Sequence, residues 1–298
     1  MADVNRRVAC SLAEYMDIVD AVANRPGAGL WFRGQSRADY RLVPSALRHG
    51  QTATDGRGYP VSPGQQTHAS GGIVVGPSPE RMLAEFKRSA RPYLGELPSN
   101  DFEWMFIAQH YGLPTRLLDW STNALVALYF AVSGAGTSGD NGKIACSEFL
   151  EGDEHRSDGS AVFIIDPGTI NDEAGHGTEP VDIAQDAVMW DAYRDPMSHQ
   201  NAPYSPICVV APHISPRIRA QSGVFSLHGF NVWPLDYYDA LRPLITKVFL
   251  PFSSTALIRQ ALSRAGVDRS FIYPGLESLA YDIVAKEHLR YSLEQPAP

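Results

Sequence analysis

The order of the helices and strands that the sequence predicts constrains the fold more than any other feature. Helical apolar spacing predicts helices at residues 11–22, 78–92, 101–111, 123–132, 254–265 and 276–290. Buried apolar runs predict strands at residues 30–32, 161–165, 207–211, 224–227 and 245–250. Because most helices come early and most strands late, the strands do not alternate with helices as in a doubly wound sheet. We therefore expect an α+β fold in a single domain over residues 1–298, with a late mixed or antiparallel split sheet.

Local signals place the ends of several of these elements. Ser11 and Glu14 have the spacing of a capping box, and Ser78 before Pro79 is typical of a helix start. Gly112 is expected to end the helix at 101–111, and Ser121 or Thr122 to cap the next one. Two stretches rich in small and polar residues, at about 49–78 and 133–160, are expected to be flexible insertions.

Composition excludes several classes of protein. With 44% hydrophobic residues the chain can bury a large core, and it contains no run of about 18 apolar residues that would span a membrane. The three cysteines form no CxxC pair, so neither a disulfide framework nor a zinc site is indicated. We therefore expect a cytoplasmic protein without a metal and without a membrane partner.

The net charge of −8 argues at first against an anionic partner. However, residues 140–195 carry 14 acidic residues against three basic ones, which leaves the remainder slightly positive. An anionic ligand at a local site is therefore compatible with the sequence.

Two dense polar clusters lie within apolar sequence. The first is residues 31–35 (WFRGQ), followed by 40–45, and the second is residues 109–121 (QHYGLPTRLLDWS). In the second, His110, Arg116 and Asp119 lie between a helix end and an almost entirely apolar helix, where charges must be paired or bound to a ligand. Two interpretations stay open: a structural Arg116–Asp119 pair with His110 bonded to backbone, or a functional site. No GxGxxG, Walker loop, HExxH or GxSxG motif is present.

These clusters resemble the FRG domain family. Residues 32–35 (FRGQ) match its name motif, and residues 108–131 (AQHYGLPTRLLDWSTNALVALYFA) resemble its central signature. Residues 217–225 (RIRAQSGVF) and 273–277 (YPGLE) resemble its later elements, so the resemblance spans about 30–285.

A strand ending in aromatic-Arg-Gly is also distantly similar to the first motif of Arg-Ser-Glu ADP-ribosyltransferases. That similarity implies an ADP-ribosyltransferase-like fold, with Arg33 and Gly34 at the NAD phosphates, Ser121 in the second motif and Gln221 in the late motif. The Ser-Thr-Ser form of the second motif is missing here. The implied catalytic residues are Arg33, Asp119 and Gln221. The implied NAD-binding residues are Arg33, Gly34, Gln35, His110, Thr115, Arg116, Trp120, Ser121 and Phe225.

The chemistry of these residue types agrees with the similarity in part. A guanidinium binds pyrophosphate through two hydrogen bonds, a glycine allows close backbone approach, and Trp120 or Phe225 could stack on nicotinamide. Loss of nicotinamide leaves an oxocarbenium-like ribose that a carboxylate stabilises. Gln221 cannot act as a base, so Asp119, Glu277 or His110 would take the acceptor's proton.

The expected function is an NAD-dependent ADP-ribosyltransferase-like enzyme, consistent with a bacterial toxin or phage-defence effector. NAD is its expected co-substrate, nucleic acid or protein its acceptor, and a neutralising antitoxin a further candidate partner. Two alternatives are a non-catalytic nucleotide- or nucleic-acid-binding module using Arg33, Arg37, Arg41 and Arg116, and a metal-independent nuclease or hydrolase using His110 and Asp119. Structural roles are also open: Arg33 paired with a buried carboxylate such as Asp119, Gln221 capping a turn, and Trp31, Trp104 and Trp120 in the core.

Overall fold

A computed structural model of the chain describes residues 3–23, 29–48, 53–54, 60–61, 78–136, 142–152, 154–187, 189–194, 205–211, 216–229 and 234–294. The expected insertion at 49–78 lies almost wholly outside these residues. Within it, only Ala53–Thr54 (β3) and Pro60–Val61 (β4) are described, as a small antiparallel pair.

The core of the fold is an eight-stranded sheet. Its spatial order is β1 (Asn5–Val8), β10 (Thr246–Pro251), β6 (Gly159–Ile165), β2 (Trp31–Gln35), β5 (Leu117–Ser121), β9 (Gly223–Leu227), β8 (Ile207–Val210) and β7 (Val181–Asp182). The β1–β10 and β7–β8 pairs at the two edges are parallel, and every pair between them is antiparallel. The mixed sheet confirms the α+β class.

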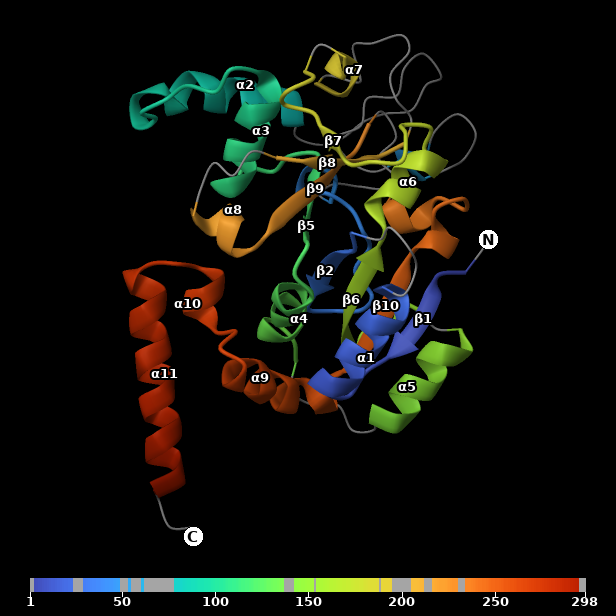
Figure 1. The fold of residues 1–298 in the computed structure, drawn as a ribbon, viewed down its shortest axis with the longest axis vertical. Helices are drawn as coiled ribbons and strands as arrows, with labels where there is room; N and C mark the ends of the chain where they lie inside the picture. Colours follow the sequence, from blue (N-terminus) through green and yellow to red (C-terminus); the bar gives the residue numbers. More distant parts are fainter. Residues whose placement is uncertain are drawn as a thin grey trace.

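The helices cover the sheet unevenly (Figure 1). They are α1 (Leu12–Ala23), α2 (Pro79–Ala90), α3 (Asp101–His110), α4 (Ala124–Ser133), α5 (Gly142–Glu151), α6 (Pro167–Glu173), α7 (Asp191–Arg194), α8 (Pro216–Ala220), α9 (Thr255–Arg264), α10 (Arg269–Ile272) and α11 (Leu276–Glu294). Short 3₁₀ turns lie at Ser45–Leu47, Arg91–Tyr93, Leu235–Tyr237, Arg242–Leu244 and Phe252–Ser254.

Two separate groups of helices pack on one face of the sheet. Helices α1, α4 and α9 share a core with the side chains of β2, β6 and β10 that point to this face, Phe32 and Val162 among them. Helices α2 and α3 share another core with β5, β9 and β8, including Leu117 and Phe225. Leu117 of β5 is thus covered by the second group of helices, whereas Asp119, two residues further along the strand on the same face, is exposed.

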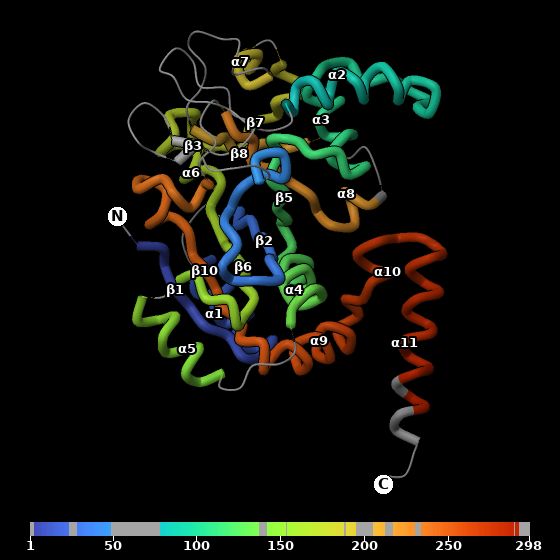
Figure 2. The backbone as a smooth tube through the Cα atoms, turned by 180° about the vertical axis from the view of Figure 1, so that it is seen from behind, coloured from blue at the N-terminus to red at the C-terminus, as the bar shows by residue number. Residues whose placement is uncertain are grey.

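The opposite face is covered mainly by α5, α6 and the turns near Leu235 and Leu241. Trp31, Leu118 and Phe163 point into the core on this opposite face. In the view from behind, β2, β6 and β10 run close together through the middle of the molecule (Figure 2). No helix among the described residues is both long and apolar enough to cross a membrane.

The pairing between neighbouring strands is shortest at the centre of the sheet, between β2 and β5. Strands β2 and β6 pair over five residues, as do β5 and β9, but β2 and β5 are joined only at Phe32 and Ser121. Beyond that pair the two strands separate, so the ladder between the two halves of the sheet is almost absent. All eight strands nevertheless form one continuous sheet.

Most predicted elements are confirmed. The helices at α1, α2, α3, α9 and α11 and the strands at β2, β6, β8, β9 and β10 occupy the expected residues within a few positions. Glu14 N bonds Ser11 Oγ at 3.2 Å, Ser78 caps α2, and Gly112 ends α3 with φ of 86°.

Four expectations were wrong. Strands β1 and β5 were missed, so the first half of the chain supplies three strands of the sheet rather than one. Asn123 caps α4, because its carboxamide oxygen accepts from Leu125 N and Val126 N, while Ser121 Oγ instead accepts from Asn123 N. The segment expected to be a loop at 133–160 contains helix α5, which buries Ala145 and Phe149 against the sheet.

Candidate functional site

Arg33 occupies the opening between β2 and β5. Strand alternation starts its side chain on the face of Trp31, and its Nη1 donates to the main-chain oxygen of Asp119 at 2.5 Å. The guanidinium thereby bonds a β5 carbonyl directly across from the separated part of β2. The side chain is only 13% exposed, and its Nε has no hydrogen-bond partner. Burial lowers the pKa of Arg33 to about 10, so the group stays charged at neutral pH while lacking a full set of partners.

Asp119 presents its carboxylate beside this guanidinium. Its side chain is 59% exposed, and Oδ2 lies 4.0 Å from Arg33 Nη1. Gln109 Nε2, at the end of α3, donates to the same oxygen at 2.9 Å, and Thr115 Oγ1 donates to Gln109 Oε1 at 2.7 Å. A short chain of hydrogen bonds therefore orients an exposed carboxylate at the edge of a buried cation. The Arg33–Asp119 pair expected as a structural alternative is formed only loosely, and this carboxylate is not buried.

Ser121, two residues after Asp119 at the end of β5, contacts Gln221. Ser121 lies on the same face as Asp119, and its Oγ donates to Gln221 O at 2.6 Å. Gln221 lies in the turn between α8 and β9, and its Nε2 donates to Ile272 O at 3.2 Å. The next residue, Ser222, has φ of 48°, the one positive value among the described non-glycine residues. Strained backbone of this kind is found often at binding sites.

His110 borders the same region from the end of α3. Its ring lies edge-on to Tyr111, with centroids 4.9 Å apart. Partial burial, with the positive charge of Arg217 adding to it, lowers the pKa of His110. The imidazole is therefore neutral at pH 7 and able to accept a proton.

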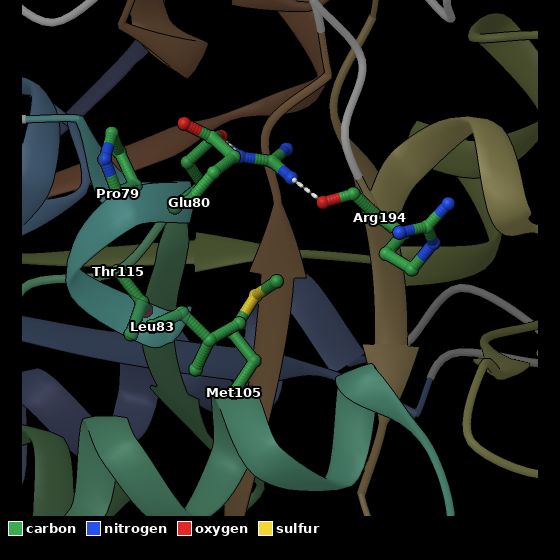
Figure 3. A pocket seen from close by; sticks show the side chains of 7 residues that line it. Pro79, Glu80, Leu83, Met105, Thr115 and Arg194 are labelled. Atoms are coloured by element: carbon green, nitrogen blue, oxygen red, sulfur yellow. Dashed lines mark hydrogen bonds and ion pairs between the residues drawn. The ribbon is translucent and has the colours of Figure 1, made fainter. Parts of the chain in front are cut away.

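Arg116 is engaged elsewhere. Its Nε pairs with Glu80 at 3.2 Å, Nη2 donates to Tyr193 O at 2.5 Å and Arg194 O at 2.9 Å, and Nη1 donates to His228 O. Figure 3 shows the small pocket, lined by Glu80, Met105 and Arg194 among others, beside which these contacts are made. The ion pair expected between Arg116 and Asp119 is replaced by one with Glu80, and Arg116 holds α2, α7 and the segment after β9 at His228 to the start of β5.

Gly34 and Gln35 have roles within the fold. A Cβ on Gly34 would lie 1.8 Å from Ala127 O, so the glycine is required by the close approach of α4 to β2. The structure thus gives this glycine a packing role, and its expected role at a cofactor stays a prediction. Gln35 is buried and donates from Nε2 to Arg41 O at 3.2 Å, and its Oε1 has no partner.

Trp120 and Phe225, expected to stack on nicotinamide, lie in the core. Trp120 is 3% exposed, points to the face opposite Asp119 and donates from Nε1 to Ser226 Oγ at 3.0 Å. Phe225 packs against Phe106, with centroids 5.2 Å apart, and is similarly buried. In this structure neither ring is accessible to a ligand, in agreement with the core role considered for Trp120.

The arginines considered as one anion-binding surface are separately paired. Arg37 binds Asp39 through two hydrogen bonds of 2.9 and 2.5 Å, and Arg41 lies 3.5 Å from Asp236. Arg48, which the sequence did not single out, is instead close enough for its charge to contribute to the lowered pKa of Arg33. Across the described residues, no group of three or more His, Cys, Asp or Glu side chains is placed to hold a metal ion.

Comparison with protein families agrees with the motifs at this site. Residues 28–139 match the model of the FRG domain, a segment that includes Arg33, Gln109, Asp119 and Ser121. The match covers 112 of the 298 residues, so it shows an FRG domain segment within the chain. Comparisons with curated proteins and with solved structures gave no match. The FRG match contains β2, α2, α3, β5 and α4, and the wider resemblance expected through residue 285, like the single-domain boundary, stays a prediction.

Three residues at the site were not predicted. Gln109 orients Asp119, Arg48 adds positive charge near Arg33, and Ser222 carries the strained turn. Gln109 lies inside the FRG signature, so its position one residue before His110 was a usable signal. Nothing local distinguishes Arg48, and the positive φ of Ser222 follows from tertiary structure.

Proposed function

We propose that this FRG domain protein is an ADP-ribosyltransferase-like enzyme that uses NAD as co-substrate. The observation that carries the proposal is the buried guanidinium of Arg33, with an unpartnered Nε, in the opening between β2 and β5. A buried cation that lacks partners is destabilising unless it has a functional anion to bind. A pyrophosphate would satisfy its free donors through charge-assisted hydrogen bonds.

The residues around Arg33 suit the later steps. Transfer breaks the glycosidic bond between C1′ of the ribose and the nicotinamide nitrogen, and nicotinamide leaves with the electron pair. The exposed carboxylate of Asp119 would stabilise the positive charge that develops on the ribose. The acceptor's nucleophilic atom then bonds C1′ and loses its proton, for which neutral His110 or Asp119 is the candidate base.

Ser121 and Gln221 would shape the rest of the pocket. In the proposed roles the Gln221 carboxamide bonds a ribose hydroxyl and the Ser121 hydroxyl positions the Gln221 turn, which its bond to Gln221 O supports. Glu277, the third candidate base, is exposed in the first turn of α11 and has no contact with these residues that argues for the role. Under this proposal the fold is ADP-ribosyltransferase-like, with the separated β2 and β5 strands at the NAD site.

The test is NAD binding by calorimetry together with release of nicotinamide by chromatography. Arg33→Met should weaken NAD binding by about 10- to 100-fold, because two charge-assisted hydrogen bonds are lost. Asp119→Asn should retain binding and reduce nicotinamide release. Arg37→Ala is the matched control, since Arg37 is exposed, paired with Asp39 and outside the opening.

Two outcomes would contradict the proposal. Absence of NAD binding by the wild type removes it altogether. NAD binding without nicotinamide release in the presence of cellular RNA, DNA and protein favours the non-catalytic nucleotide-binding alternative.

A further inference from the structure

Alternating arginine and tyrosine side chains connect α8, α10 and α11. Arg217 Cζ lies 4.8 Å from the ring centroid of Tyr273, and Arg269 Cζ lies 5.7 Å from the same ring and 4.8 Å from that of Tyr281. We name Arg217, Tyr273, Arg269 and Tyr281 the cation–aromatic row. Figures 1 and 2 both show α8, α10 and α11 along one side of the molecule.

The arginines of this region have no carboxylate partner. Within the described residues Arg217, Arg219 and Arg269 form no ion pair, and Arg269 Nε is buried without a hydrogen bond. The nearby carboxylates are engaged elsewhere: Asp268 with Lys286 at 3.4 Å, and Asp282 with Ser270 N at 2.7 Å. A guanidinium stacked on a ring keeps its in-plane N–H donors free. The row therefore presents oriented donors suited to phosphate oxygens.

The row begins at the candidate site. Gln221 N donates to Arg217 O at 3.0 Å, and Gln221 Nε2 donates to Ile272 O, the residue before Tyr273. The charge of Arg217 also reaches His110. A polymer bound along the row would thus approach Gln221 and His110 with one of its units.

The charge distribution favours an anionic polymer here. Helices α8 and α10 together carry three arginines and no acidic residue. Tyr281 is 58% exposed, which leaves ring surface on which an unpaired base can stack. A duplex offers phosphates but no unstacked bases, and a protein segment has neither feature in a repeating pattern.

We propose that the cation–aromatic row binds single-stranded nucleic acid. Arg217 and Arg269 contact its phosphates, and Tyr281 stacks on a base. Its role as the acceptor of ADP-ribose rests on the proposed function, whereas binding itself does not depend on NAD.

The experiment measures binding of fluorescent single-stranded RNA, single-stranded DNA and duplex DNA by anisotropy at several salt concentrations. Arg217→Glu with Arg269→Glu should weaken single-strand binding by about tenfold or more and reduce the log–log salt slope by at least about 1.4, since two phosphate contacts are lost. Tyr281→Ala should weaken it about fivefold or more, through lost stacking. The control, Arg81→Glu with Arg91→Glu, makes the same charge change at two exposed arginines on the α2 side and should stay within twofold.

Several results would overturn the proposal: no single-strand binding by the wild type, equal or tighter duplex binding, or an equal loss in the control variant. Thermal unfolding of each variant shows whether a loss of nucleic-acid binding is caused by misfolding. If the double arginine variant misfolds, the binding measured for Tyr281→Ala decides. Transfer of label from NAD to protein alone would refute the acceptor role while the NAD chemistry stands. Single-strand binding without NAD consumption would retain the row and refute the proposed function.

Discussion

Replacing Arg33 by methionine should stabilise the fold while weakening NAD binding. Methionine has similar length but no charge, so it fills the opening between β2 and β5 without a buried cation. Burial lowers the pKa of Arg33 from 12.5 to about 10. That lowering corresponds to roughly 3 kcal/mol by which the folded chain disfavours the charged side chain. The hydrogen bond to Asp119 O offsets about 1–2 kcal/mol of this. We expect the free energy of unfolding to rise by about 1–2 kcal/mol.

The measurement is urea unfolding at pH 7 of the wild type and Arg33→Met, followed by circular dichroism. Arg116→Met is the matched control, because Arg116 is also buried but donates to Glu80 and to several main-chain oxygens. Removing it leaves those groups unpaired, and the free energy of unfolding should fall by about 3 kcal/mol or more. Two buried arginines should therefore respond with opposite signs.

The reasoning about Arg33 is refuted if Arg33→Met lowers the free energy of unfolding by more than about 1 kcal/mol. Arg33 would then be a structural connection between β2 and β5 in place of a missing ladder. Unchanged NAD affinity in a well-folded Arg33→Met protein would refute its binding role independently of stability.

Two further predictions concern stability. Gly34→Ala should destabilise the fold by about 3 kcal/mol or more, because the new Cβ would lie 1.8 Å from Ala127 O. Thermal unfolding should show a much lower midpoint for this variant. An unchanged midpoint would mean that α4 does not approach β2 this closely. Burial, with the charge of Arg116 adding to it, lowers the pKa of His228 to about 3. Below pH 6.5 the unfolded chain therefore binds a proton that the folded chain does not, and the free energy of unfolding falls as the pH falls. His228→Phe should remove about 2 kcal/mol of the loss between pH 7 and pH 5, as measured by urea unfolding at both values; equal pH dependence of the two proteins would refute the assignment.

The sequence predicted elements with strong periodicity and missed those formed by tertiary contact. Strand β5 contains Asp119 between apolar residues that point to both faces, so it has neither alternation nor a continuous apolar run. Helix α5 buries only Ala145 and Phe149 and leaves Ile144 and Leu150 exposed, which weakens its periodic signal. Asn123 follows two residues that are equally good caps, and the choice among them depends on the bond that Ser121 makes to Gln221.

The candidate site was predicted as a set of residues but not as an arrangement. Arg33, Asp119, Ser121 and Gln221 were identifiable from motifs, and the structure brings them together around β5. The partners of Arg116 come from α2, from α7 and from His228 just after β9, which no local pattern connects to it. The core positions of Trp120 and Phe225 depend on which face of a strand each one takes, and β5 was not predicted as a strand.

The placement of β2 and β5 in the sheet limits how the FRG segment can exist. The matched residues 28–139 contain these two strands, whereas β6 and β9, which pair with their outer edges, lie later in the chain. Cut out at those boundaries, the segment would hold two strands joined at one residue pair and would expose bare backbone along both sides. Such edges are templates for aggregation. The matched segment is therefore not a complete unit of folding, and expression or transplantation of the site should keep the later strands with it.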